Sequence, residues 1–244
     1  MFDHLTIRVS DRAVSRAFYE LALGELGFEL TSSGDDFDEW WDFSISQARE
    51  DRPVTRGLHV AFVARSHDAV DTWWNAMTDA GYRDDGAPGG RPQYTPSYYG
   101  AFVLDPDGNS VEAMHGGERK VGDDRIDHTW IRVRDLAAAQ RFYETVAPFG
   151  GFRLGTRAVG RAHFTACDRS FAVVADTPPT EGLHLAFPAR NNAAVDEFHR
   201  TALAAGYRDN GAPGERPEYH DGYYGAFVLD PDGNNVELVT HNRD

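Results

Sequence analysis

The sequence of 244 residues has only one cysteine, Cys167, and no run of about 18 apolar residues. A single cysteine excludes an internal disulfide framework and fits a reducing compartment, so we expect a cytoplasmic protein. The missing apolar run argues against a membrane-spanning helix. The start, MFDHLTIRV, has no basic segment followed by an apolar stretch, so we expect no signal peptide. Basic residues are also scarce. The 24 Lys and Arg against 39 Asp and Glu give a net charge of −15, which argues against binding to a nucleic-acid backbone.

What the chain does have is a long internal repeat. Residues 81–114 and 206–239 are identical at 25 of 34 aligned positions. DHLTIRV (3–9) returns as DHTWIRV (127–133), and GLHVAF (57–62) returns as GLHLAF (182–187). The repeat predicts two similar domains, 1–116 and 126–244, joined by the polar, glycine-rich linker 117–125.

Each copy divides again into two stretches with the same order of elements. A short alternating strand comes first, then a capping residue and an amphipathic helix, then several short strands. The Asp-Pro-Asp-Gly-Asn segments at 105–109 and 230–234 are typical of turns between strands. The pattern therefore predicts four strand–helix–strands units in an α+β protein.

Two histidines and one glutamate recur at matching places in the two copies. They are His4, His59 and Glu112 in the first copy and His128, His184 and Glu237 in the second. In each strand the apolar residues alternate with these side chains, so the candidates point to the face away from the helices. Two imidazoles and a carboxylate on one face suit a divalent metal with positions left for substrate. Fe(II), Mn(II), Ni(II) and Zn(II) are all compatible.

With these residues the chain resembles the vicinal oxygen chelate superfamily, which includes glyoxalase I, bleomycin-resistance proteins and extradiol dioxygenases. The resemblance is carried by DHLTIRVSDRAVSRAFYE and DHTWIRVRDLAAAQRFYE, by GLHVAF and GLHLAF, and by the DPDGN-x-VE endings. It implies four βαβββ modules in two tandem domains that form half-open β-barrels, with helices outside and a divalent metal inside. It also implies that the six recurring residues are the metal ligands.

The resemblance leaves the grouping of the six ligands open. In one grouping each site takes all three ligands from one copy. In the other, His4 joins His184 and Glu237 while His128 joins His59 and Glu112, as ligands from two chains join in small members of the superfamily. In the second case the chain is a monomeric pseudo-dimer; a homodimer is the alternative. Two departures also restrict the activity. No acid occupies the strands at 43–46 and 171–174, where glyoxalase I has its fourth ligand. Phe102 and Phe227 stand where dioxygenases carry a tyrosine.

Other residues are candidates for substrate binding and proton transfer. Substrate-binding candidates are two arginines on the strand face away from the helices, Arg8 and Arg132. The others lie in the GAPG-x-RP-x-Y tracts and are Arg91, Arg216, Tyr94 and Tyr219. Catalytic candidates are the nearby tyrosines and the histidines found only in the second copy: Tyr98, Tyr223, His163 and His220. A rigid surface loop, structural ion pairs and drift after duplication are the alternative explanations.

Two functions fit these observations. The first is a metal-dependent enzyme, a lyase, isomerase or dioxygenase, that acts on a small substrate chelating through neighbouring oxygens. The second is a metal-free protein of the bleomycin-resistance type that sequesters a drug or metabolite between aromatic side chains. The retained ligand sets favour the enzyme. In both cases the partner is a small molecule, with no nucleic acid and no membrane involved.

Overall fold

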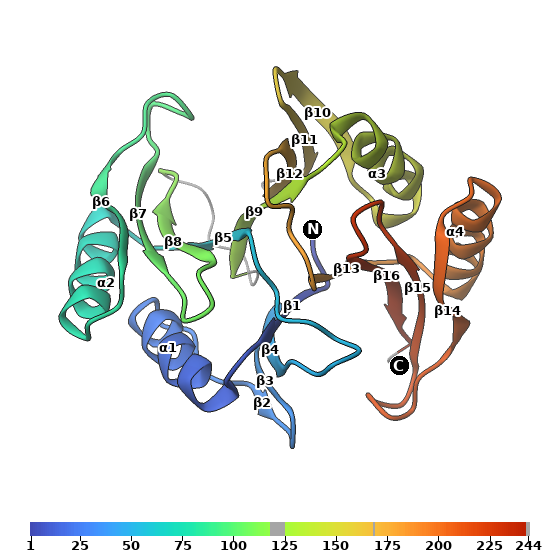
Figure 1. The fold of residues 1–244 in the computed structure, drawn as a ribbon, viewed down its shortest axis with the longest axis horizontal. Helices are drawn as coiled ribbons and strands as arrows, with labels where there is room; N and C mark the ends of the chain where they lie inside the picture. Colours follow the sequence, from blue (N-terminus) through green and yellow to red (C-terminus); the bar gives the residue numbers. More distant parts are fainter. Residues whose placement is uncertain (118–124, 168, 243–244) are drawn as a thin grey trace. The chain divides into compact units, whose positions relative to one another are not determined.

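The computed structural model describes residues 1–117, 125–167 and 169–242. Residues 118–124, most of the predicted linker, lie outside this description. Within it there are four helices, α1 (Arg12–Glu25), α2 (His67–Asp79), α3 (Leu136–Gly150) and α4 (Asn192–Ala204) (Figure 1). None of the described helices is long and apolar enough to cross a membrane.

Each helix is preceded by one strand and followed by three, so the four predicted βαβββ modules are confirmed. The strands are β1 (His4–Val9), β2 (Ser32–Ser33), β3 (Phe37–Trp40), β4 (Phe43–Gln47), β5 (Leu58–Val63), β6 (Asp84–Gly90), β7 (Tyr99–Leu104), β8 (Ser110–His115), β9 (Ile126–Val133), β10 (Arg153–Ala158), β11 (Arg161–Ala166), β12 (Arg169–Ala175), β13 (His184–Pro188), β14 (Arg208–Glu215), β15 (Tyr223–Leu229) and β16 (Asn235–His241). Hydrogen bonds join them in the orders β14-β15-β16-β13-β1-β4-β3-β2 and β10-β11-β12-β9-β5-β8-β7-β6. Neither sheet closes into a barrel.

The chain forms two compact units whose boundaries fall inside β1 and β9. One unit is Thr6–Trp130; the other combines Met1–Leu5 with Ile131–Asp244. The boundaries of the compact units therefore differ from the boundaries of the sequence repeats. The first residues of β1 belong with the second repeat, and the first residues of β9 belong with the first.

Side-chain hydrogen bonds fix where the helices begin. Asp11 accepts hydrogen bonds from the backbone of Ala13 and Val14 at 3.0 and 3.1 Å at the start of α1. Asp135 does the same for α3 at 2.9 and 3.0 Å. These carboxylates satisfy backbone N–H groups that have no partner within the helix.

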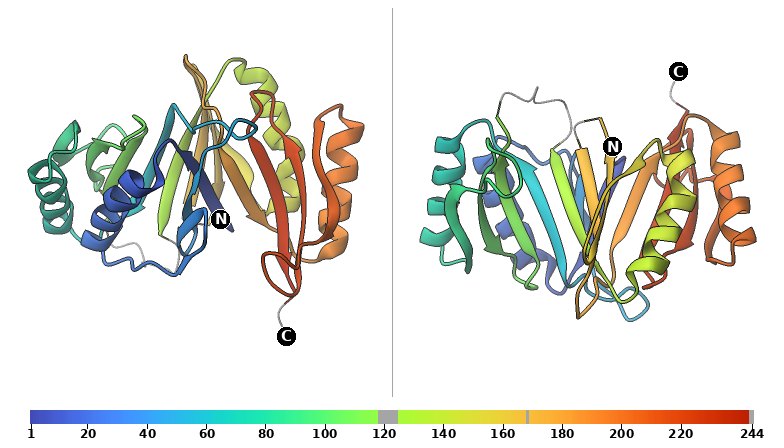
Figure 2. Two further views of the ribbon diagram at one scale, coloured as in Figure 1. Left: turned by 60° about the horizontal axis from the view of Figure 1, so that its bottom comes forward. Right: turned by 90° about the horizontal axis from the view of Figure 1, so that it is seen from above.

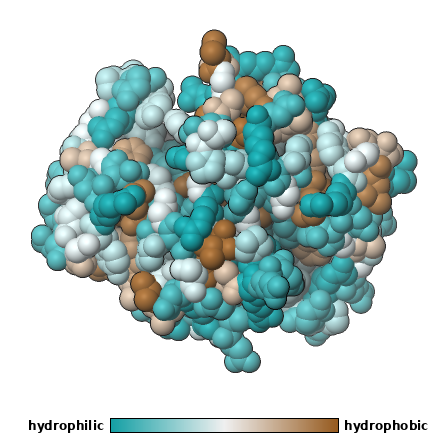
Figure 3. Space-filling view, in the orientation of Figure 1, coloured by the Kyte–Doolittle hydropathy of each residue, from teal (hydrophilic) through white to brown (hydrophobic). Residues whose placement is uncertain are grey.

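The helices cover one face of the strands in each unit (Figures 1 and 2): α2 packs on β6–β8, and α4 packs on β14–β16. The apolar positions of the alternating strands point into this core; Leu58, Val60 and Phe62 of β5 are at most 2% exposed. His59 lies between them in sequence and therefore faces the other side. On the molecular face of Figure 3 hydrophilic residues predominate, and hydrophobic ones form small separate patches.

The predicted turns at 105–109 and 230–234 are present and lead into β8 and β16. Asp105 accepts hydrogen bonds from the backbone of Asp107 and Asn109 at 2.9 and 2.8 Å, and the hydroxyl of Tyr19 in α1 donates to it at 2.9 Å. Burial raises the pKa of the equivalent Asp230 to about 6. The hydroxyl of Tyr143 in α3 donates to Asp230 at 3.4 Å. Each turn is thus tied to one helix of its unit, and this contact holds the start of the strand that carries the glutamate.

Candidate metal centres

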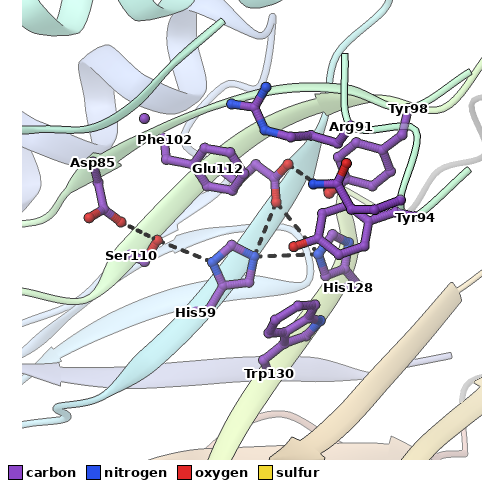
Figure 4. A pocket seen from close by; sticks show the side chains of 12 residues that line it. His59, Asp85, Arg91, Tyr94, Tyr98, Phe102, Ser110, Glu112, His128 and Trp130 are labelled. Carbon is purple, nitrogen blue, oxygen red and sulfur yellow. Dashed lines mark hydrogen bonds and ion pairs between the residues drawn. The ribbon is translucent and has the colours of Figure 1, made fainter. Parts of the chain in front are cut away.

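Among the described residues of the unit Thr6–Trp130 there is one group of metal-competent side chains, which we call the His59 triad: His59, Glu112 and His128 (Figure 4). His59 Nε2 lies 3.1 Å from Glu112 Oε2 and 3.4 Å from His128 Nε2. His128 Nε2 is 3.5 Å from the same carboxylate oxygen. Glu112 is 1% exposed, so its carboxylate is buried and faces both imidazoles.

The other unit contains the His184 triad: His4, His184 and Glu237. His184 Nε2 is 3.0 Å from both His4 Nε2 and Glu237 Oε2, and His4 Nε2 is 3.6 Å from that oxygen. The structure therefore brings each opening-strand histidine to the later histidine and glutamate of the other repeat. Of the two groupings that the sequence left open, this is the exchanged one.

Both triads have the spacing that a divalent metal requires. Ligand atoms about 2.1 Å from one ion at angles of 90–110° lie about 3.0–3.4 Å from one another. Four of the six distances between the donor atoms, 3.0–3.4 Å, lie in this range, and the other two, 3.5 and 3.6 Å, exceed it by at most 0.2 Å. Two imidazole nitrogens and one carboxylate oxygen would leave two or three coordination positions for water or substrate.

A second layer of hydrogen bonds orients the ligands. The Tyr98 hydroxyl donates to Glu112 Oε1 at 2.6 Å, and the Tyr223 hydroxyl donates to Glu237 Oε1 at 2.6 Å. Burial, together with the neighbouring carboxylate, raises the pKa of both phenols far above the ordinary value. Both tyrosines are therefore neutral donors in this state, and each fixes one oxygen of its glutamate.

Aspartates hold the opening-strand histidines in the same way. His128 Nδ1 lies 2.9 Å from Asp127 Oδ1, and His4 Nδ1 lies 2.8 Å from Asp3 Oδ1. A carboxylate only accepts, so each Nδ1 carries the proton and each Nε2 presents a lone pair to its triad. Burial alone would raise the pKa of Asp3, but hydrogen bonds from His241 and His4 bring it below its ordinary value.

A cavity of about 330 Å³ opens beside the His59 triad. Aromatic rings of Tyr94, Tyr98, Phe102 and Trp130 line it, and Arg91 lies at its edge (Figure 4). Arg91 donates to the carbonyls of Ala87 and Gly90 at 2.9 and 3.3 Å, and its guanidinium carbon lies 5.6 Å from the centre of the Phe102 ring. The cavity has the size of a small-molecule site.

The other residues predicted to bind substrate or transfer protons lie outside the cavity of the His59 triad. Arg216 repeats the position of Arg91, 5.5 Å from the Phe227 ring, and Tyr219 is 61% exposed. Arg8 does not line the cavity of the His59 triad, and the Arg132 guanidinium lies 3.4 Å from the Asp176 carboxylate. His163 stands opposite Ala172 in β11.

His220 belongs to a hydrogen-bonded chain that ends at the His184 triad. Its Nδ1 donates to the Asp221 carbonyl at 2.7 Å, and its Nε2 lies 2.8 Å from His241 Nδ1. His241 Nε2 lies 2.9 Å from Asp3 Oδ2, and Asp3 holds His4. The first repeat has Thr95 and Gly116 at the positions of these two histidines.

Sequence reasoning missed several residues around the triads: Asp3, Asp127, Ser110, Asn235, Trp130, Gly100, Gly225 and His241. The signal for Asp3 and Asp127 was present, since an Asp-His pair opens both repeats. The two glycines gave no chemical signal, because their role is the space that they leave. A Cβ on Gly225 would lie 2.6 Å from Glu237 Oε1, and a Cβ on Gly100 would lie even closer to Glu112 Oε1.

Comparison with known proteins agrees with this fold. The profile of the Glyoxalase/Bleomycin resistance protein/Dioxygenase superfamily matches residues 1–113 and 125–238. The chain belongs to this superfamily. No curated protein sequence matches it.

Solved structures share the fold at low sequence identity. Glyoxalase I from Zea mays is similar with a TM-score of 0.69 and 18% identity, over 98% of this chain and 92% of the maize chain. A putative dioxygenase from Bacillus subtilis is similar with a TM-score of 0.67 and 12% identity, over 99% of this chain and 85% of that one.

Proposed function

We propose that the chain is a divalent-metal-dependent enzyme that acts on a small organic substrate chelating through neighbouring oxygens. The observation that carries the proposal is the pair of triads, each with two imidazole nitrogens and one carboxylate oxygen within 3.6 Å of one another. In each triad a tyrosine orients the glutamate and an aspartate orients the opening-strand histidine. Such supporting hydrogen bonds tune metal ligands and keep them in place.

A bound divalent metal would supply Lewis-acid chemistry, which favours negative charge on substrate oxygens. The aromatic rings beside the His59 triad would exclude water and stack on a flat substrate. Among the described residues no carboxylate forms an ion pair with Arg91, so its charge is directed to an anionic group of the substrate. Tyr98 and Tyr223 would position the glutamates rather than remove protons, because their protons are already donated to those carboxylates.

Proton transfer needs a different group at each site. In the His184 site His220 is a candidate, acting through His241 and Asp3 rather than by direct contact with the triad. The reaction type remains a choice among lyase, isomerase and dioxygenase. A metal-free sequestering protein is the weaker proposal, because it has no use for a buried glutamate that faces two imidazoles.

Elemental analysis of protein purified without chelator tests the proposal. We expect metal in both triads after loading with Fe(II), Mn(II), Ni(II) or Zn(II), with one equivalent lost in His59→Ala and the other in His184→Ala. Oxygen consumption with a catechol and Fe(II) would identify a dioxygenase. Failure of every metal to bind at the triads, in protein whose unfolding is cooperative, would refute the enzyme.

A further inference from the structure

We infer that the two triads are not equivalent: the His59 triad is the tighter metal site, and the His184 triad binds metal more weakly. The inference rests on the proposed function, since it assumes that both triads take a metal. It comes from the hydrogen-bond partners of His59 and His184, which differ between two otherwise similar sites.

His59 is held in the form that a metal needs. Its Nδ1 lies 3.2 Å from Ser110 Oγ, and the Ser110 hydroxyl donates to Asp85 Oδ2 at 2.8 Å (Figure 4). Because that hydroxyl proton is given to the carboxylate, Ser110 Oγ accepts from His59 and the imidazole proton sits on Nδ1. His59 Nε2 then faces Glu112 Oε2 at 3.1 Å and His128 Nε2 at 3.4 Å, where a metal would lie.

His184 has a different pair of partners. Asn235 Nδ2 lies 2.5 Å from His184 Nδ1, and Asn210 Nδ2 donates to Asn235 Oδ1 at 2.8 Å. An amide nitrogen only donates, so His184 Nδ1 accepts and the imidazole proton sits on Nε2. That proton points into the triad, where Nε2 lies 3.0 Å from Glu237 Oε2 and from His4 Nε2.

A metal at the His184 triad must therefore displace this proton. The proton moves to Nδ1, and Asn235 has to turn its amide so that Oδ1 accepts from it. Asn210 must turn as well, because its Nδ2 would otherwise face the Nδ2 of Asn235. At the His59 triad, Nδ1 already donates to Ser110 Oγ, so metal binding at Nε2 requires no rotation of its partners.

Charge acts in the same direction. The repeat aligns Asp85 with Asn210 and Ser110 with Asn235, so the first site has a carboxylate where the second has an amide. A carboxylate linked to a ligating imidazole makes it a stronger donor, and loss of such a partner typically lowers metal affinity about 10–100-fold. The partners of the glutamates match, with tyrosine hydroxyls at 2.6 Å in both sites. His241 also hydrogen-bonds to Asp3, which weakens the hydrogen bond between the Asp3 carboxylate and His4.

Titration with Mn(II), followed by electron paramagnetic resonance of the free ion, tests the inference. We expect two binding steps whose affinities differ by about 10–100-fold. His59→Ala should remove the tight step and His184→Ala the weak one. The exchange Asn210→Asp with Asn235→Ser should strengthen the weak step and leave the tight step as an internal control. The reverse exchange, Asp85→Asn with Ser110→Asn, should weaken the tight step alone.

Nitrogen-15 NMR of the imidazoles in metal-free protein gives a readout that needs no metal. We expect the His59 ring to carry a proton on Nδ1 and the His184 ring to carry its proton on Nε2, with none on Nδ1. Equal affinities at both sites, together with exchanges that shift neither step, would overturn the inference and leave the proposed function standing. Absence of binding at both triads would instead overturn the proposed function, while the NMR spectrum still reports on the tautomers.

Discussion

Gly225 tests whether the buried glutamate is placed for metal binding. Gly225 pairs with Val239 across β15 and β16, and an added Cβ would lie 2.6 Å from Glu237 Oε1. A real Cβ essentially never lies under 3.0 Å from another heavy atom and ordinary contact begins at 3.4 Å, so Gly225→Ala moves the carboxylate or the strand by about 0.4–0.8 Å. Metal–ligand bonds tolerate only about 0.2 Å. The substitution should therefore lower the Mn(II) affinity of the His184 triad about 10–100-fold or more, equivalent to about 1.4–2.7 kcal/mol.

Two matched variants separate this effect from the loss of a glycine. Gly24 lies in α1 with nothing within 4 Å of its added Cβ, so Gly24→Ala should stabilise the fold by about 0.5–1 kcal/mol and leave both metal sites unchanged. Gly100→Ala makes a closer clash with Glu112 and should weaken the His59 triad alone. Mn(II) titration and thermal unfolding of the three variants provide the data. If Gly225→Ala keeps the affinity of the His184 triad, the glutamate is not a ligand there.

Three further predictions follow from single contacts. Tyr98→Phe should lower the metal affinity of the His59 triad about 10–100-fold in the same titration, since Glu112 loses the hydroxyl that orients it; an unchanged affinity would contradict this. Arg91→Met should reduce the preference of the metal-loaded protein for 3,4-dihydroxybenzoate over catechol by about 10–100-fold, the worth of a hydrogen bond to a charged group. Tryptophan fluorescence can follow this binding, and an equal preference in both proteins would be the contrary result. Hydrogen bonds from Arg12 hold the pKa of Asp38 in the folded protein below its ordinary value of 3.8. The Arg12–Asp38 pair therefore stabilises the fold above pH 3.8, and this contribution is lost as the pH falls through the pKa of Asp38 in the folded protein. Asp38→Asn should cost about 3 kcal/mol at neutral pH and flatten the loss of stability below pH 3.8, measured by urea unfolding. A slope equal to that of the parent would be the opposite finding.

The fold could be predicted from the sequence because its signals are local. Alternation in β5 gives one apolar face, and Asp11 and Asp135 mark helix starts that the structure retains. Because the sequence is repeated, each strand or helix pattern occurs twice, and an assignment made in one copy could be checked in the other. The same alternation placed His59 and Glu112 on the face away from the helices, which is a statement about a single strand and needs no long-range information.

The grouping of the ligands could not be predicted in the same way. Alternation tells which face His4 uses, but the neighbour of β1 in the sheet depends on long-range pairing that no local pattern encodes. The supporting contacts were hidden for a similar reason. Ser110 and Asp85 are 25 positions apart, and His241 and Asp3 are 238 apart. The role of Gly225 could not be predicted, because the glycine acts only by leaving space for the Glu237 side chain.

The exchange of opening strands predicts how the chain behaves when it is divided. A fragment of residues 1–117 keeps His59 and Glu112 but lacks His128, while 125–244 keeps His184 and Glu237 but lacks His4. Neither fragment alone can assemble a triad of the kind seen here as a monomer. Mixing the two should restore both Mn(II) steps, whereas one fragment should bind Mn(II) only in a self-paired dimer that supplies its own opening histidine. Size-exclusion chromatography with metal detection separates these cases, and metal that travels with a monomeric fragment would contradict the exchanged arrangement.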